Sequence, residues 1–315
     1  MPTGLLIDLN DGRPMVITAG MRAAIYVADV SSAAGRFTIP GGISAGDQFI
    51  WMIDEPVNMY FSGAILHVNF VRSVQVSGNQ IWCVRGSSNV QQNNTEVVMA
   101  GQIWKISGAS QSSNTGLLIA DSTDFTIIPT GATVGSCIYY DTITFTGTWT
   151  IPSNGVVFAY WDNAGVVLER YGNKLYCKKY NDSAVGDPGD GTVTIRVAVF
   201  ANVRPQPGPG LNFFNAAGEC TFSTASKPLI IQSLYSPSES FQAVNGMIMI
   251  STNGWYSNSG NGKGYYMTRR KGLRMSGGNV MVARGSYWGQ NYTDYAFNNQ
   301  NGVLSQLIPV IPNFY

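Results

Sequence analysis

The feature that most constrains this sequence is a stretch of about fifteen residues that occurs three times. Residues 210–224 read GLNFFNAAGECTFST, residues 4–18 read GLLIDLNDGRPMVIT and residues 116–130 read GLLIADSTDFTIIPT. In this register Gly4, Gly116 and Gly210 coincide. Each stretch predicts two short strands joined by a turn, because β-branched and apolar residues flank an Asn, Asp or Gly cluster. An internal repeat of this kind indicates three copies of one structural unit.

A second landmark lies in the back half of each copy. A Gly-Asn or Gly-Gly pair separates apolar runs in residues 76–86 (VSGNQIWCVRG), 170–180 (RYGNKLYCKKY) and 275–285 (MSGGNVMVARG). These pairs predict two-residue hairpin turns, whose positive φ angles glycine and asparagine accept. The turn glycines Gly78 and Gly172 both precede the next opening glycine by 38 residues. The front halves span 74, 56 and 67 residues, which predicts variable loops on a shared fold.

The composition favours an all-β protein. Charged residues make up 12% of the 315 residues, about half the usual share. Short β-favouring runs bounded by turn residues recur about nine times in the first copy, the spacing of a sandwich or jelly roll. We therefore predict three tandem β-sandwich domains, jelly-roll or immunoglobulin-like, over residues 1–110, 111–207 and 208–315. A Ser-rich stretch at 107–114 and a Pro-rich stretch at 204–209 are the predicted linkers.

The basic residues are concentrated in the third copy. Residues 227–315 contain seven basic and two acidic residues. The cluster Arg269, Arg270, Lys271 and Arg274 has no nucleic-acid-binding motif beside it, so we predict no nucleic-acid partner. A solvated loop or an intersubunit contact is the favoured interpretation of these charges.

The remaining composition bears on compartment and redox state. The first residues lack a basic start and a long apolar run, so we predict no signal peptide. No run approaches the ~20 apolar residues of a membrane helix, so we predict no membrane insertion. Synthesis in a cytosol predicts reduced thiols at Cys83, Cys137, Cys177 and Cys220. Cys83 and Cys177 share one repeat position with Val282, which predicts a packing role.

No active site is predicted. His67 is the single histidine and alternates with apolar residues, which argues against a zinc site or a Ser-His-Asp triad. Asp187 and Asp190 in DPGDG could ligate calcium, but a β-turn is the favoured interpretation. We therefore predict no enzyme activity, no cofactor and no bound metal.

The positive signal for binding lies in the third copy, in two stretches rich in aromatic residues and asparagine. Tyr and Trp supply large rigid contacts, and Asn and Ser supply adaptable hydrogen bonds, a mixture typical of recognition surfaces. The alternative is that these aromatics pack the domain or a subunit interface. The predicted binding residues are Trp255, Tyr256, Tyr265, Tyr266, Arg269, Arg270, Lys271, Tyr287, Trp288 and Tyr292.

The opening unit of the third copy resembles modules that recur in small tail proteins of lambdoid and HK97-like siphophages. In those modules a line similar to GLxxxNxxGxxxF precedes a β domain. Gly210, Leu211, Asn215, Gly218 and Phe222 match that line, whereas copies one and two match it loosely. The resemblance implies a virion structural protein of the tail tip or tail fibre, assembled in the host cytoplasm. It implies other tail proteins as partners and supplies no catalytic residues.

These observations lead to one leading and two alternative hypotheses. The leading hypothesis is a non-enzymatic phage tail structural protein. Copies one and two would attach it to the tail, and copy three would contact a partner or a host surface glycan or protein. Tail symmetry favours a symmetric oligomer. The first alternative is a carbohydrate-binding module or lectin. The second, a tail-associated depolymerase, is disfavoured by the sparse acidic residues.

Overall fold

The computed structural model describes the backbone of residues 4–10, 14–18, 21–62, 65–87, 95–106, 116–118, 125–127, 134–153, 155–182, 186–259, 264–293 and 300–315. Side chains are described for these residues except 4–5, 65, 116–118, 125–127, 259, 264–266 and 291–293. Every regular element in this part of the chain is a strand, which confirms the all-β prediction. A search of the same residues for a helix able to span a bilayer found none.

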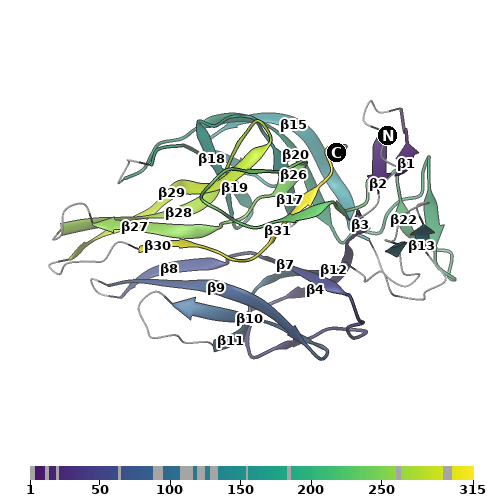
Figure 1. Ribbon diagram of the computed structural model, residues 1–315, viewed down its shortest axis with the longest axis horizontal. Coiled ribbons are helices and arrows are strands. Elements are labelled where there is room, and N and C mark those ends of the chain that lie inside the picture. Colours follow the sequence, from purple (N-terminus) through teal and green to yellow (C-terminus); the bar gives the residue numbers. More distant parts are fainter. Residues whose placement is uncertain are drawn as a thin grey trace.

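Each copy opens with the hairpin that its repeated stretch predicts. The hairpins are β1 (Gly4–Ile7) with β2 (Met15–Thr18), β13 (Gly116–Leu118) with β14 (Phe125–Ile127), and β21 (Asn212–Phe214) with β22 (Cys220–Ser223). Figure 1 shows strands of all three hairpins gathered at one end of the molecule, beside the N-terminus. Gly210 is so close to the first hairpin that an added Cβ would lie 3.2 Å from Leu9 Cδ2. We call this group of hairpins the hairpin cap.

After its hairpin, each copy forms a group of three hydrogen-bonded strands, and the spatial order of these strands is the same in all three copies. Copy one forms β4-β12-β7 (Ile25–Val30, Gly101–Ile106 and Gln48–Ile53). Copy two forms β15-β20-β17 (Ser136–Thr146, Thr192–Ala201 and Val156–Tyr160), and copy three forms β24-β31-β26 (Ser233–Tyr235, Ile308–Ile311 and Met247–Met249). In each case the last of the three strands in sequence lies between the other two. The sequence repeat therefore extends to the topology.

The second landmark forms a hairpin in each copy, in the opposite layer. The pairs are β9 (Ile65–Ser77) with β10 (Gln80–Ser87), β18 (Val166–Tyr171) with β19 (Lys174–Lys179), and β28 (Gly264–Ser276) with β29 (Asn279–Thr293). The turn glycines Gly78, Gly172 and Gly277 have φ angles of 56°, 59° and 55°. Glycine adopts this left-handed region without steric cost. A short strand borders each hairpin, namely β6 (Phe37–Thr38), β16 (Thr148–Thr150) and β25 (Gln242–Ala243).

Copies two and three share both of their sheets. β17 pairs antiparallel with β26 through Phe158↔Met249 and Ala159↔Ile248, which gives the six-stranded sheet β15-β20-β17-β26-β31-β24. In the other layer, β18 meets β28 at Leu168↔Leu273. Copy one instead has two sheets of its own, β4-β12-β7 and β5-β11-β10-β9-β8, with β5 at Ala33–Ala34, β8 at Val57–Ser62 and β11 at Thr95–Val98. The domain bounds 1–110, 111–207 and 208–315 stay a prediction.

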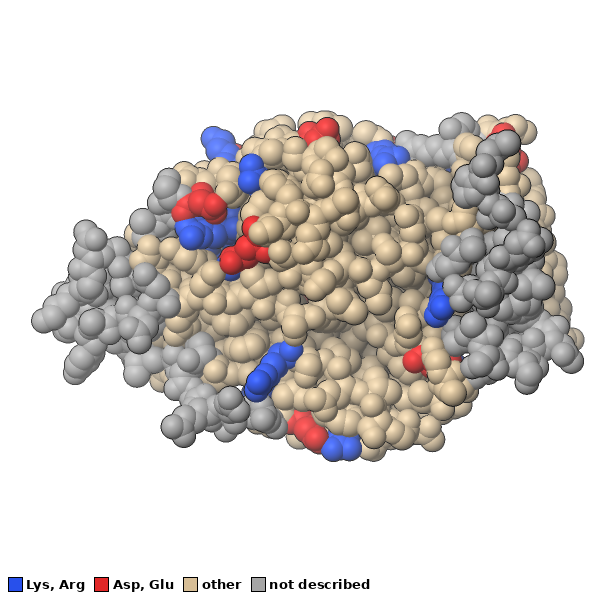
Figure 2. Space-filling view, in the orientation of Figure 1, with Lys and Arg blue, Asp and Glu red and all other residues tan. Residues whose placement is uncertain are grey.

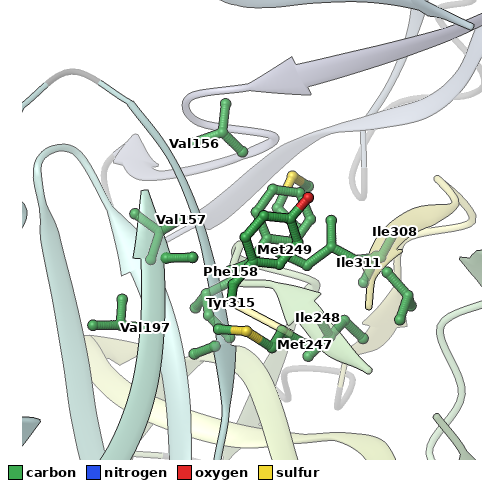
Figure 3. Close-up of a cluster of buried hydrophobic side chains, with 14 of the residues drawn as sticks. Val156, Val157, Phe158, Val197, Met247, Ile248, Met249, Ile308, Ile311 and Tyr315 are labelled. Carbon is green, nitrogen blue, oxygen red and sulfur yellow. The ribbon is translucent and has the colours of Figure 1, made fainter. Parts of the chain in front are cut away.

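The largest core lies where the shared sheets meet. Figure 3 shows Phe158, Met249, Ile311 and Tyr315 gathered in it, and all four side chains are buried. The Tyr315 hydroxyl donates to the Pro228 carbonyl and accepts from a backbone N–H at 3.2 Å. Burial raises the pKa of Tyr315. The apolar residues at 308–315 are thus part of this core.

Copies one and three contain an additional strand that copy two lacks, because the corresponding connection in copy two is too short. β8 follows β7 in copy one, and β27 (Gly254–Ser259) follows β26 in copy three, where it also pairs with β30 (Gln300–Val303). In copy two, only residues 161–165 separate β17 from β18. The unequal front halves therefore differ by a strand, and not by loops alone as the sequence predicts.

The close approach of β28 to β18 gives a first prediction. An added Cβ at Gly272 would lie 2.2 Å from the Leu168 carbonyl oxygen, so Gly272→Ala forces the two strands apart. We expect it to lower the free energy of unfolding by about 1–3 kcal/mol, as overpacking does. Gly289→Ala is the control, because its nearest neighbour, Phe61, would lie 3.6 Å away. Urea unfolding followed by circular dichroism measures both, and equal midpoints would contradict the close approach.

Candidate functional site

The predicted basic cluster lies in β28, which is an interior strand. β27 pairs with one of its edges and β29 with the other. Arg269 and Lys271 are fully buried, and Arg270 and Arg274 are half-buried. The solvated-loop interpretation is therefore wrong for Arg269 and Lys271. Consecutive cations in the sequence do not reveal that both faces of their strand are covered by other parts of the chain.

Arg269 binds backbone carbonyls across the boundary between copies two and three. Its Nε donates to the Gly285 oxygen at 3.0 Å, and its Nη2 donates to the Arg284 and Gly285 oxygens, both at 2.9 Å. Its Nη1 donates to the Asn181 oxygen of copy two at 2.7 Å. Burial lowers the pKa of Arg269, and the charge of Arg284 lowers it further. This guanidinium thus bridges the two copies.

Glu169 of copy two is the buried acid on the same boundary. Ser286 donates its hydroxyl to Glu169 Oε1 and its backbone N–H to Oε2 at 3.3 Å. The preceding Gly285 leaves room for the carboxylate, since an added Cβ would lie 2.3 Å from Oε2. Burial raises the pKa of Glu169, against the opposing effects of the Ser286 hydrogen bond and the Arg270 and Arg269 charges.

The charge of Lys271 is compensated by side chains of copy three. Its Nζ lies 2.5 Å from Glu239 Oε1 and 2.5 Å from Asn301 Oδ1. Burial lowers the pKa of Lys271, and the hydrogen bond to Glu239 opposes that shift. A buried ammonium with two oxygen partners is a structural contact, because a buried charge needs compensation.

The half-buried arginines of this region stack on tyrosines. The pairs are Arg270 with Tyr171, Arg274 with Tyr180 and Arg284 with Tyr256, with the guanidinium carbon 4.0, 3.7 and 3.5 Å from the ring centroid. Such contacts contribute about 0.5–1 kcal/mol when exposed and more when desolvated. On the face in Figure 2, basic and acidic side chains are scattered and often adjacent, on a surface of mostly uncharged residues.

The tryptophans of copy three pack against copy one. Trp255 is buried, with its ring centroid 4.4 Å from that of Phe70. Gly302 lies against its other side, where an added Cβ would be 2.3 Å from the indole. Trp288 is half-buried, and its centroid lies 5.1 Å from that of Phe61. The packing interpretation of the aromatics describes both tryptophans.

The sequence predicts that four more tyrosines bind a ligand, and the structure describes the side chain of one of them, Tyr287. Tyr287 is half-buried; burial raises its pKa, and the charge of Asp187 adds to the shift. Tyr265 and Tyr292 are register partners in β28 and β29, and Tyr266 follows Tyr265 in β28. The side chains of these last three tyrosines lie outside the described residues. A binding role for them stays a prediction.

A polar cleft of about 450 Å³ lies where the three copies meet. Its lining side chains come from all of them and include Asp29, Asp54, Arg170, Asn173, Met249 and Ser251. Arg170 donates to the Gly172 and Gly155 carbonyls, both at 3.0 Å. Burial lowers the pKa of Arg170, while the charge of Asp54 opposes the shift. No sequence motif points to this cleft, because its residues converge only after the copies assemble.

The remaining candidates for chemistry have structural partners. Asp187 and Asp190 lie 3.4 and 2.8 Å from Lys178 Nζ, and Asp187 also accepts from the Gly189 N–H in the predicted turn. All four cysteines are free thiols, and burial raises the pKa of Cys83, Cys137 and Cys177 to about 12. Among the described residues, no three His, Cys, Asp or Glu side chains form a metal-binding group.

Fold and site together define an all-β protein of three fused copies, whose basic and aromatic side chains bind one another across the copy boundaries. The model of one protein family matches residues 4–294, a span that includes copies one and two and most of copy three. The chain belongs to this family, which is described as a family of unknown function (DUF6453). A search of curated proteins gave no match, and a search of solved structures gave none.

The burial of Trp255 gives a second prediction. Trp255→Ala should lower the free energy of unfolding by about 3–5 kcal/mol, because it removes a large buried side chain between Phe70 and Gly302. Phe214→Ala is the control, since that aromatic side chain is 51% exposed. Urea unfolding by circular dichroism compares the two. A loss no larger than that of Phe214→Ala would show that Trp255 does not support the interface.

The buried carboxyl of Glu169 gives a third prediction. Its folded-state pKa is raised above the ordinary value of 4.5, so the folded state holds the proton more tightly than the unfolded state. The stability that this provides is lost as the pH rises from about 4.5 through the raised pKa. The Glu169→Gln variant has no such loss, so its stability relative to wild type should increase over that interval. Urea midpoints from pH 4 to 8 test this, and parallel curves would contradict it.

Proposed function

We propose that this chain is a non-enzymatic structural protein of a phage virion, at the tail tip or tail fibre, which assembles in the host cytoplasm. The observation that supports this best is the opening module, which resembles a recurrent tail module and is used three times to build one cap. In this proposal other tail proteins are the partners, and the protein forms a symmetric oligomer.

Each residue of the tail-like line in copy three has a structural role, as expected of a building module. Asn215 Oδ1 accepts the N–H groups of Ala217 and Glu219 at 3.0 and 2.9 Å, which fixes the turn. Gly218 has a φ of 78°, which glycine favours. Phe222 is fully buried, and Leu211 packs in the same cluster. The line therefore encodes a hairpin and not a catalytic loop.

The hairpin cap offers the surface that we propose for tail attachment. Leu6 and Val16 are cross-strand partners in β1 and β2, with exposed fractions of 63% and 37%. Phe214 of the third hairpin is also exposed. Exposed apolar residues on a small two-stranded sheet are typical of surfaces that a partner covers.

A carbohydrate-binding module is the second candidate. One observation favours it: copy one carries a groove lined by Asn58, Asn69 and Arg85, and the exposed Tyr60 lies two residues from Asn58 in β8. A saccharide site in copy one is compatible with the tail proposal, in which host contact would use a glycan. It differs from the expectation that copy three makes that contact.

The tail proposal predicts that the protein is part of purified particles. Antibodies against it should label the tail end of particles released by the strain that encodes it, as seen by negative-stain electron microscopy. The pair of substitutions Leu6→Asp and Phe214→Asp should leave the isolated protein folded but prevent incorporation. Val76→Asp is the control, because Val76 is a similarly exposed apolar residue outside the hairpin cap. Unlabelled particles that lack the protein would refute the tail role and favour the lectin.

A further inference from the structure

A groove of about 510 Å³ lies at the open end of copy one. It runs over the larger sheet of that copy, and its lining includes Ser32, Asn58, Asn69, Arg85, Thr95 and Met99. Figure 1 shows β8 and β9 extending beyond the smaller sheet β4-β12-β7. Where the smaller sheet ends, its strands no longer cover this face.

The alternation of side chains places a set of polar groups on this face. Asn58 pairs with Asn69, and Tyr60 pairs with His67, across β8 and β9. Val57 and Met59, which alternate with Asn58 and Tyr60 along β8, point to the opposite face, where they are buried with Trp255 of copy three. Because successive side chains of a strand alternate between faces, the docking of copy three on one face leaves the amides and rings on the other.

Amide and aromatic groups lie side by side on this face. Directly opposed residues of an antiparallel pair have Cβ atoms about 4.5–5.5 Å apart, so Asn58 and Asn69 can bind one ligand together. The Tyr60 and His67 rings stack, with centroids 5.0 Å apart and an interplanar angle of 9°. They lie two residues further along the same strands, about 7 Å from the amides. Tyr60 is accessible to solvent, with 43% of the residue exposed.

Arg85 is the cation of the groove, and no described acidic residue lies in the lining beside it. It is exposed on β10, opposite Thr95 of β11, and it is the one charged residue among those described in the lining. The neighbouring Glu96 carboxylate instead accepts two hydrogen bonds from Arg36, both at 2.7 Å. Glu96 adjoins Thr95 in the strand and so points to the opposite face. Among its described lining residues, the groove thus combines one guanidinium with neutral polar groups and apolar residues, and none of them is acidic.

We propose that this groove binds an acidic saccharide. A guanidinium binds a carboxylate through two parallel hydrogen bonds, which suits Arg85 to a uronic or sialic acid. The amides of Asn58 and Asn69 both donate and accept, as sugar hydroxyls require. The Tyr60–His67 stack offers an apolar surface for a pyranose ring. The volume lies in the range of about 300–1,000 Å³ that is usual for small-molecule sites. The inference rests on the proposed function only for the source of the saccharide, a host surface glycan.

The test uses two matched pairs of probes and the full-length protein. Isothermal titration calorimetry compares trigalacturonate with galactotriose, and 3′-sialyllactose with lactose. We expect at least one acidic probe to bind ten-fold or more tightly than its neutral partner. Arg85→Gln should abolish that preference, and the Asn58→Ala, Asn69→Ala double variant should weaken binding at least ten-fold. Lys179→Gln, which removes an exposed cation of copy two, should bind as wild type does.

Three results would overturn the proposal, given circular dichroism that shows folded variants. These are no binding of either acidic probe, equal binding of acidic and neutral partners, and an unchanged preference in Arg85→Gln. The titration needs no particle, so its outcome is separate from that of tail labelling. Labelled tails without saccharide binding would refute this site alone, whereas binding without labelled tails would refute the tail role alone.

Discussion

The antiparallel pairing of β17 with β26 is the contact on which the arrangement of the copies depends. It joins two three-stranded sheets into one and places Phe158 and Met249 in a common core. Once that layer is continuous, the opposite layers must also meet, and they do so at Leu168 and Leu273. Gly272, beside Leu273, allows the contact because a side chain there would collide with the Leu168 carbonyl. We call this contact between copies two and three the seam. Residues that flank the seam are removed from solvent as a consequence.

The seam explains why charged side chains are buried in a chain with so few of them. Glu169 directly follows Leu168, and Arg269 and Lys271 lie in the strand that the seam covers. Removing such charges from water costs several kcal/mol each unless hydrogen bonds and opposite charges compensate. Arg269 is compensated by carbonyls, Glu169 by Ser286 and Lys271 by Glu239. The described basic residues of the third copy are therefore spread over internal contacts and do not form one external patch.

Local features of the fold could be predicted from the sequence, because neighbouring residues determine them. The turn glycines Gly78, Gly172 and Gly277 have the expected backbone conformation, and the three opening hairpins form where the repeat places them. The burial of Arg269 and Trp255 could not be predicted, since Asn181 and Phe70 are far away in the sequence. The groove in copy one was missed for the same reason. Asn58, Asn69 and Arg85 come from three strands, and only strand register brings them together.

The unequal front halves of the copies connect these observations. The added strands β8 and β27 lie in the two copies that meet around Trp255, and copy two, which joins copy three through its sheets, has no counterpart. One face of β8 is thus committed to copy three, and the alternation of its side chains leaves Asn58 and Tyr60 to solvent on the other face. Trp255, which the sequence predicts to bind a ligand, is buried where copy three packs against copy one. The same packing supports β8 and β9, the strands that line the groove. Trp255 therefore contributes to the placement of copy one through packing, together with the pairing of Ala23 with Ile230.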